Sequence, residues 1–186
     1  MSSTIIVGDG PGGLSAALFL AKNGHEVTVL GTDETAMHYA LLRNYLGIPE
    51  ITGSEVQTIA RDQVASFGAT IRDEKVAAVA SSDDGFTVTL EDGSNLTAET
   101  LILTEGRNPA LARSLDLATD DDEAIVVDAD FRASVDGVYV VGRSIRPKRS
   151  QAIISAGAGA TAALDILSRV AGKDVQDWDS PPKEED

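Results

Sequence analysis

The chain has 186 residues and no cysteine, and its 30 Asp and Glu residues outnumber its 15 Lys and Arg residues, which gives a net charge of −15 at pH 7. The length fits one domain with a core of its own. The negative charge disfavours nucleic acid and anionic membranes as partners, and the absence of cysteine excludes disulfides, thiolate nucleophiles, redox CxxC pairs and cysteine-bound metals.

The kind of charge also indicates an environment. Only 5 of the 15 bases are Lys, and the acids are spread along the whole chain. Such a composition resembles that of proteins from salt-loving organisms, because concentrated salt shortens the Debye length to about 3 Å and screens self-repulsion. An acidic protein from an ordinary organism is the alternative.

The N-terminus has no basic segment and no run of 18 apolar residues occurs, so we expect a soluble, cytoplasmic protein.

The first 31 residues predict a β-turn-α-β unit, with strands at 4–7 and 26–30 and a helix over 14–23 that stops before Gly24. Residues 54–67 predict an amphipathic helix. Its expected apolar face consists of Val56, Ile59, Ala60, Val64 and Ala65.

The middle of the chain predicts an antiparallel meander. Three extended segments, 75–80, 85–90 and 95–97, are joined by turn sequences at 82–85 and 91–94. The segments that follow are strands at 100–104, 124–127 and 138–141, a connection at 107–123 and a long helix at 152–170. We expect one domain over residues 1–172 and an acidic, disordered tail over 173–186, with Trp178 exposed.

The pattern Gly8-x-Gly10-x-x-Gly13 is the motif that most directly indicates a ligand. It follows a strand and opens a helix, which is the context that a dinucleotide-binding fingerprint requires. The pyrophosphate of a dinucleotide would approach Gly10 and the free N–H groups of the helix N-terminus. A glycine-rich turn without a ligand is the alternative. The acid that usually binds the adenosine ribose at the end of the second strand is missing, because Gly31 stands there; Asp33 could replace it, or serve as a turn or N-cap residue.

Five segments resemble thioredoxin-reductase-like flavoproteins of the pyridine-nucleotide-disulfide oxidoreductase superfamily. They occur in the family's order and span residues 4–170. The matching stretches are 5–30, the Asn-Tyr-Leu-Gly-Ile-Pro of 44–49, the strand and turn of 101–106, the late strand of 137–143 and the helix that starts at 151–152.

The resemblance implies a three-layer α/β fold of the FAD/NAD(P)-binding, Rossmann-like type, with helices on one face of a parallel sheet and a small antiparallel meander on the other. It implies FAD as the cofactor. Gly8, Gly10, Pro11 and Gly13 would hold the pyrophosphate, and the backbone near Val76 would meet the adenine. The positions expected on the flavin side are Asn44, Gly142, Arg143, Gln151 and Ala152, and Gly106 is a further expected cofactor-binding position.

The sequence departs from the family in two ways. The family's nicotinamide domain lies between the strands at 100–104 and 138–141, where residues 107–123 are too few for a domain of about 100 residues. In addition, Gly31 replaces the ribose acid, Glu105 a threonine, and Arg143 the aspartate beside the ribityl chain. Either a Glu105–Arg143 pair fills an emptied flavin site, or Arg143 grips the pyrophosphate and compensates for Glu105.

Two functions follow. The first is a single-domain FAD-binding redox carrier, or an FAD-dependent oxidoreductase, that uses an external electron donor and is not a disulfide reductase. The second is a degenerate domain that has lost flavin and binds another nucleotide or a protein, including a second copy of itself. The basic stretch Arg143, Arg146, Lys148 and Arg149 would meet an anionic ligand or partner, or pair with the acids of 120–123. No catalytic residue or metal site is evident, and His25 and His38 are expected at the surface.

Overall fold

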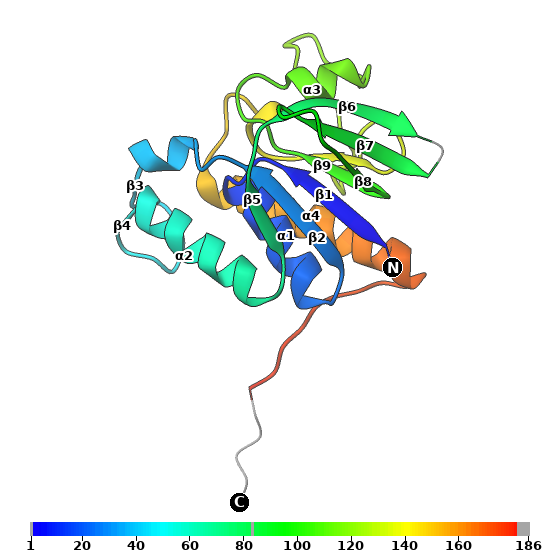
Figure 1. The fold of residues 1–186 in the computed structure, drawn as a ribbon. Coiled ribbons are helices and arrows are strands. Elements are labelled where there is room, and N and C mark those ends of the chain that lie inside the picture. The colour runs from blue at the N-terminus through cyan, green and yellow to red at the C-terminus, as the bar shows by residue number, and fades with distance from the viewer. Residues whose placement is uncertain (1, 83, 182–186) are drawn as a thin grey trace, which may run out of the picture.

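The computed structural model describes residues 2–82 and 84–181. Its centre is a five-stranded parallel sheet with the strand order β10-β9-β1-β2-β5 (Figure 1). The strands are β1 (Ser3–Val7), β2 (Glu26–Gly31), β5 (Thr70–Asp73), β9 (Thr100–Leu103) and β10 (Val138–Val140).

Helices and a second sheet cover opposite faces of this central sheet (Figure 1). The helical face carries α1 (Pro11–Lys22), α2 (Gly53–Ser66) and α4 (Ala152–Ala171). The other face carries the antiparallel meander β6 (Val76–Ser82), β7 (Gly85–Leu90) and β8 (Asn95–Ala98), with the short helix α3 (Ala110–Ser114) beside it. The smaller elements are β3 (Leu41–Leu42), β4 (Ile51–Thr52) and the 3-10 helices η1 (Ala36–Tyr39) and η2 (Gly142–Ser144). The predicted three-layer α/β architecture is confirmed.

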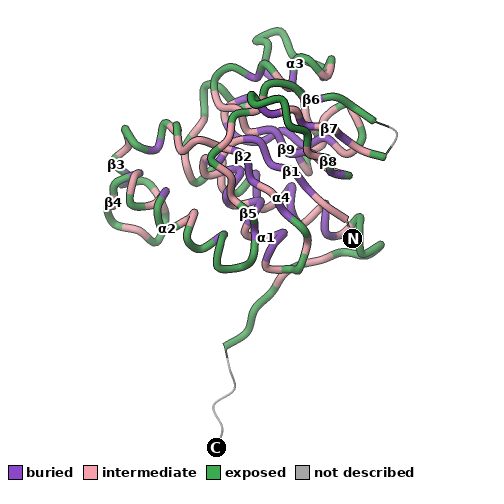
Figure 2. Tube along the Cα trace, viewed as in Figure 1, coloured by how far each residue is buried: buried purple, intermediate pink, exposed green. Residues whose placement is uncertain are grey.

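Two hydrophobic cores form because side chains alternate across the central strands. In β1, Ile6 points into the helical core, whereas Ile5 and Val7 point into the core under the meander. The same alternation divides β9 and β10, in which Ile102 and Tyr139 face the helices. In Figure 2 the buried residues concentrate in the central strands and in the helix surfaces against them. Strands buried on both faces explain the continuous apolar runs that the sequence shows.

Several predicted elements differ in the structure. Helix α1 begins at Pro11, three residues earlier than expected, because Gly10 is the N-cap and proline is favourable at the first helical position. Residues 124–127 are not a strand, since Ile125 makes only one isolated bridge, to Thr119. The connection 107–123 contains helix α3. The edge strand β5 was not predicted; its sequence Thr-Ile-Arg-Asp has one large apolar residue, since an edge strand is only partly buried.

Helix α2 buries only part of the predicted face: Val64 lies in the helical core and Ala60 packs against it, but the other predicted residues do not join them. Ile59 is 58% exposed, whereas Gln57 is 2% exposed and Val64 is 1% exposed. Gln57 is buried because its side-chain amide donates to the backbone oxygen of Asp9 at 2.7 Å. A polar contact with the glycine loop, together with apolar packing of Val64, therefore sets the orientation of this helix.

Helix α4 is long and apolar enough to cross a membrane by length and composition alone. In the structure it packs along α1, and a Cβ atom on Gly159 would lie 3.0 Å from the backbone nitrogen of Ala16. Ala162, Ala163 and Ile166 of α4 belong to the helical core. Burial accounts for part of its apolar composition, since 33% of its most apolar 18-residue window is buried.

The chain after α4 has neither helix nor strand up to residue 181, but it contacts the body. Lys22 forms ion pairs with Asp177 at 2.9 Å and with Asp179 at 2.5 Å, and the backbone N–H of Val175 donates to Ser168. Trp178 is 87% exposed. The rest of the expected disordered tail, 182–186, lies outside the described residues, as does Asp83 in the predicted turn at 82–85.

Candidate functional site

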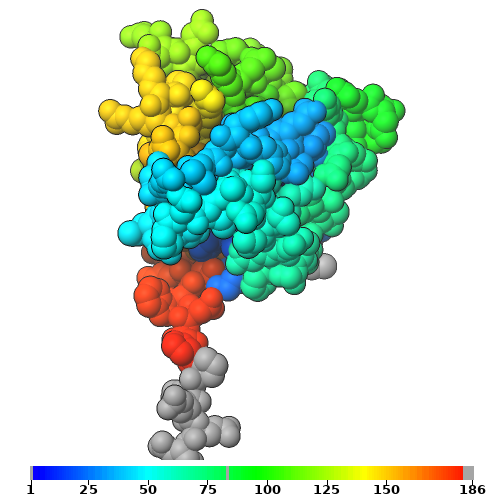
Figure 3. Space-filling model, turned by 90° about the vertical axis from the view of Figure 1, so that its left-hand side faces the viewer, coloured from blue at the N-terminus to red at the C-terminus, as the bar shows by residue number. Residues whose placement is uncertain are grey.

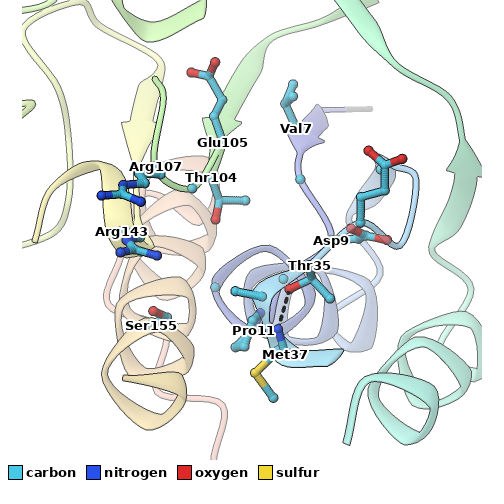
Figure 4. A pocket seen from close by; sticks show the side chains of 18 of the residues that line it. Val7, Asp9, Pro11, Thr35, Met37, Thr104, Glu105, Arg107, Arg143 and Ser155 are labelled. Atoms are coloured by element: carbon cyan, nitrogen blue, oxygen red, sulfur yellow. Dashed lines mark hydrogen bonds between the residues drawn. The ribbon is translucent and has the colours of Figure 1, made fainter. Parts of the chain in front are cut away.

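A cavity of about 620 Å³ opens at the carboxyl ends of β1, β2 and β9, between the first turns of α1 and α4 (Figure 4). This is the edge at which parallel α/β sheets bind ligands. Nine of the twelve predicted site residues line it: Gly8, Gly10, Pro11, Val76, Gly106, Gly142, Arg143, Gln151 and Ala152. In the space-filling view, the segments around 36–52 and 142–151 share one face of the molecule (Figure 3). They are joined by a hydrogen bond from Asn44 to Gln151 at 3.0 Å.

The three glycines of the fingerprint meet different requirements. Gly8 has φ +104°, and a Cβ atom there would lie 2.5 Å from the backbone oxygen of Thr104. A Cβ atom on Gly13 would collide with the Gly8 backbone oxygen and lie 2.9 Å from Cγ2 of Thr104. At Gly10 the nearest atom would be Oγ1 of Thr35, 3.6 Å away. Gly8 and Gly13 are thus required by packing, whereas Gly10 leaves open space on the side of the cavity.

The N-terminus of α1 is free to meet an anion. Gly10 is its N-cap, no side chain of the described residues caps it, and its first turn holds no acid. The first N–H groups of the helix, and the positive end of its dipole, are therefore available to the cavity. Such an N-terminus is a suitable site for phosphate.

Asp9, inside the glycine loop, is a site residue that the sequence analysis missed. It lines the cavity and is 5% exposed. Its Oδ2 accepts a hydrogen bond from the backbone N–H of Asp33 at 3.0 Å and forms an ion pair with Arg61, which also pairs with Asp73 at 2.5 Å. The sequence did offer one clue to Asp9, because an acid is unexpected inside a fingerprint that should receive phosphate. Nothing in the sequence indicated its partner Arg61, which lies 52 positions away.

Three predicted site residues do not line the cavity. Gly13 lies beneath the loop, packed on Gly8. Asn44 lies at the margin, where it donates to Gln151. Asp33 has φ +56°, and its backbone oxygen accepts from Nε2 of His38 at 2.8 Å. The structure therefore places Asp33 in the turn after β2, where its N–H supports Asp9, rather than among the cavity residues.

Glu105 does not pair with Arg143. Its carboxylate accepts hydrogen bonds from the backbone N–H groups of Leu111 at 2.8 Å and Ala112 at 2.9 Å, in the first turn of α3. Burial raises the pKa of Glu105, and the two backbone hydrogen bonds oppose that shift. The pair, one of the two predicted arrangements, is therefore not formed, because backbone donors of α3, a helix that the sequence did not predict, bind the Glu105 carboxylate.

Arg143 instead lies near Arg107 on the side of the cavity opposite Asp9 (Figure 4). Its Nε is buried, and it has no hydrogen-bond partner among residues 2–82 and 84–181. Two other bases of the predicted basic stretch are engaged elsewhere: Lys148 pairs with Asp122 at 2.8 Å, and Arg146 lies 5.8 Å from the ring centre of Phe131. Arg107 and Arg143 thus give the cavity a cationic wall.

The sequence profile of the family described as "Pyridine nucleotide-disulphide oxidoreductase" matches residues 2–53 and 40–160. The chain belongs to this family. Among curated relatives, the thioredoxin reductase of Aquifex aeolicus is 34% identical to this chain over 106 residues. That match covers 55% of the present chain and 33% of the relative, so it spans about a third of the relative's length.

Solved structures share the fold of this chain. A thioredoxin reductase from Gloeobacter violaceus superposes with a TM-score of 0.86 at 17% identity, over 96% of this chain and 98% of that one. The atypical thioredoxin reductase TRi from Desulfovibrio vulgaris Hildenborough gives a TM-score of 0.83 at 19% identity, over 92% and 99%. The chain is therefore a thioredoxin-reductase-like domain of the FAD-binding type.

The residues present fit the two ends of FAD unequally. The open side of Gly10 and the uncapped α1 suit the pyrophosphate. At the flavin end, a cationic wall stands where the family resemblance leads one to expect an aspartate beside the ribityl chain. No cluster of three or more His, Asp or Glu side chains suited to a metal occurs in the described part of the chain.

Proposed function

We propose that this chain is an FAD-binding domain that acts as a redox carrier or an oxidoreductase supplied by an external electron donor, and that it is not itself a disulfide reductase. The observation that carries the proposal is the single cavity that joins the glycine loop and the α1 N-terminus to the start of α4. A dinucleotide needs such a cavity, because its two halves must be held at once.

The chain's own residues would bind and orient the cofactor. The backbone of Gly8, Gly10 and the first turn of α1 would hold the pyrophosphate. Val76 would meet the adenine, and Gln151 and Ala152 would border the flavin. When bound, the flavin would supply the electron-transfer chemistry, and the protein would orient it and tune its potential.

The need for an external donor is supported by what joins β9 to β10. Between Thr104 and Gly137 the structure has α3, turns and isolated bridges, and no second nucleotide-binding domain. The sequence given also has no cysteine for dithiol exchange. Electrons would therefore arrive from, and leave to, other molecules.

The proposal is tested by a visible absorbance spectrum. The protein is purified in high salt, incubated with FAD and desalted; a retained flavin band in about 1:1 ratio to protein is expected. Riboflavin is the control, since it lacks the ADP half that the glycine loop would hold. Folded protein that stays colourless would overturn the proposal.

A second candidate is a degenerate domain that binds another nucleotide or a protein partner, including a second copy of itself. The cationic wall favours it, because Arg107 and Arg143 suit a ligand more anionic than a ribityl chain and a flavin.

Arg143→Asp distinguishes the two candidates. If Arg143 grips the FAD pyrophosphate, the variant should bind FAD about tenfold more weakly, the loss expected for one charge-assisted contact. If Arg143 excludes flavin, the variant should gain FAD affinity. Arg149→Asp, an equal charge change at an exposed position of the same stretch, is the matched control and should leave FAD affinity unchanged.

A further inference from the structure

Positions 31 and 9 are neighbours in the site, and an acid is missing at the first and present at the second. Gly31 ends β2, where nucleotide-binding folds of this kind place an acid that binds the adenosine ribose, and it has no side chain to do so. Asp9, in the loop after β1, has a buried carboxylate. Resting on the proposed function, we infer that Asp9 is the ribose-binding acid of this chain, and that it reaches the ribose site from the glycine loop instead of from the end of β2.

The geometry places the Asp9 carboxylate where a side chain on β2 would begin. A Cβ atom built on Gly31 would lie 2.6 Å from Oδ1 and 2.8 Å from Cβ of Asp9. Non-bonded atoms do not approach so closely, so residue 31 must be glycine as long as residue 9 carries this side chain. The absence of an acid at position 31 and the presence of one at position 9 are therefore linked, because the two side chains would occupy the same space.

Three contacts hold Asp9 in this position. Gln57, itself 2% exposed, donates to the backbone oxygen of Asp9 at 2.7 Å. Arg61, one helical turn further along α2, pairs with Oδ2, and the N–H of Asp33 donates to the same oxygen at 3.0 Å. No hydrogen bond to Oδ1 is formed within the described residues, so this oxygen retains its capacity to accept from a ribose hydroxyl.

The charges around Asp9 allow it to stand beside a pyrophosphate. Arg61 offsets its negative charge, so the carboxylate need not repel phosphate held at the α1 N-terminus. Asp9 and the cationic wall of Arg107 and Arg143 lie on opposite sides of the cavity (Figure 4). A dinucleotide would therefore lie with its adenosine ribose against Asp9 and its other half toward the wall.

The test is competition against bound FAD by ADP and by 2′-deoxy-ADP and 3′-deoxy-ADP, followed by flavin fluorescence. Wild-type protein should prefer ADP to at least one deoxy analogue by about tenfold, as expected for a hydrogen bond to a charged group. Asp9→Ala should reduce this preference to about twofold or less, mainly by weakening ADP itself. Asp33→Asn, at the acid that the sequence suggested, is the matched control and should keep the full preference.

The steric conflict between a side chain at position 31 and Asp9 supplies a second test. Gly31→Glu alone should destabilise the protein and weaken FAD binding, because its side chain meets Asp9. Asp9→Gly combined with Gly31→Glu, which removes the Cβ of residue 9 as well as its carboxylate, should restore both the fold and the preference for ADP. This double variant separates loss of a ligand contact from simple unfolding of Asp9→Ala.

Each outcome is decisive. Retention of FAD with equal competition by all three nucleotides would overturn this inference and leave the proposed function standing. Loss of the preference in Asp33→Asn but not in Asp9→Ala would also overturn it. Protein that retains no FAD and is not bound by ADP would overturn the proposed function and this inference together.

Discussion

Glycines of the same motif differ in what a methyl group would disturb. At Gly13 a Cβ atom would collide with the backbone of Gly8 and press on Thr104, so the contact is internal to the protein. At Gly10 the backbone has φ −75°, which any residue adopts, and the nearest atom is 3.6 Å from the added carbon. One position therefore serves the fold, and the other is free to serve a ligand.

We predict opposite effects of alanine at these two positions. Gly13→Ala should lower the free energy of unfolding by about 1–3 kcal/mol, as overpacking usually does. Gly10→Ala should cost less than about 1 kcal/mol, since it only weakens an N-cap, but its methyl group should lower FAD affinity by about tenfold or more because the phosphate cannot approach the backbone. Denaturant unfolding and FAD titration measure the two quantities. A Gly13→Ala protein as stable as wild type, or a Gly10→Ala protein with undiminished FAD affinity, would contradict this assignment.

Helix α4 is joined to the edge of the sheet by a partly buried polar contact. Tyr139 of β10 donates its hydroxyl proton to Asp165 of α4 at 2.6 Å, and Arg132 pairs with the same carboxylate. Burial and the contact with Asp165 raise the pKa of Tyr139 to about 12. Burial alone would raise the pKa of Asp165, but the hydrogen bonds from Arg132 and Tyr139 outweigh it and hold that pKa below its ordinary value.

The lowered pKa gives Asp165→Asn a pH-dependent effect. Because the folded-state pKa lies below the unfolded value, Asp165 stabilises the fold above the unfolded pKa, and this stabilisation is lost as pH falls through the folded pKa. At about pH 7 the variant should be about 1–3 kcal/mol less stable than wild type, and the difference should shrink below about pH 4. Denaturant unfolding across this range is the measurement.

Asp136→Asn is the control for the same helix. Asp136 also pairs with a base of α4, Arg169, but its side chain is 84% exposed, so the change should cost about 0–1 kcal/mol. A stability difference between wild type and Asp165→Asn that is as large at pH 3 as at pH 7 would show that the carboxylate charge is not its source.

Elements with strong local signals could be predicted from the sequence, and those defined by tertiary contacts could not. β1, β2, β9 and β10 are apolar on both faces, and the fingerprint glycines follow β1, so sequence alone revealed most of the sheet and the loop at its edge. By contrast, β5 was not predicted because it is a partly buried edge strand, and the orientation of α2 was not predicted because the polar Gln57 faces inward.

The same division applies to the site. Glycines, proline and the start of α4 belong to local patterns, and the cavity includes them. The partners of Asp9 and of Glu105 depend on elements that the sequence did not orient or predict, α2 and α3. A side chain whose contacts come from a distant helix cannot be assigned from its neighbours in sequence. For Asp33, the turn that the sequence offered as one alternative is what the structure shows. The Glu105–Arg143 pair, one of two arrangements inferred from the family resemblance, is absent because α3 supplies the donors to Glu105.

The whole molecule has twice as many acids as bases, so its ion pairs leave many carboxylates uncompensated. Pairs such as Lys22–Asp177 and Lys148–Asp122 neutralise single charges, and the net charge remains −15. Like charges confined to a folded surface repel one another more strongly than in an extended chain, so the net charge opposes the compact state. Added salt weakens both the pairs and this repulsion, and the excess of acids determines which effect is larger.

We therefore predict that KCl stabilises this protein. The melting temperature at pH 7 should rise by about 5–10 °C, corresponding to about 2–3 kcal/mol for a chain of this size, as KCl increases from about 0.05 M to 1 M and the Debye length falls to about 3 Å. Near pH 4.4, where the net charge is about zero, the rise should be much smaller, because little self-repulsion remains to be screened. Thermal unfolding in KCl at the two pH values measures both slopes. A melting temperature that is independent of KCl at pH 7 would mean that the folded chain tolerates its charge without screening, and would remove the physical reason for assigning it to a saline environment.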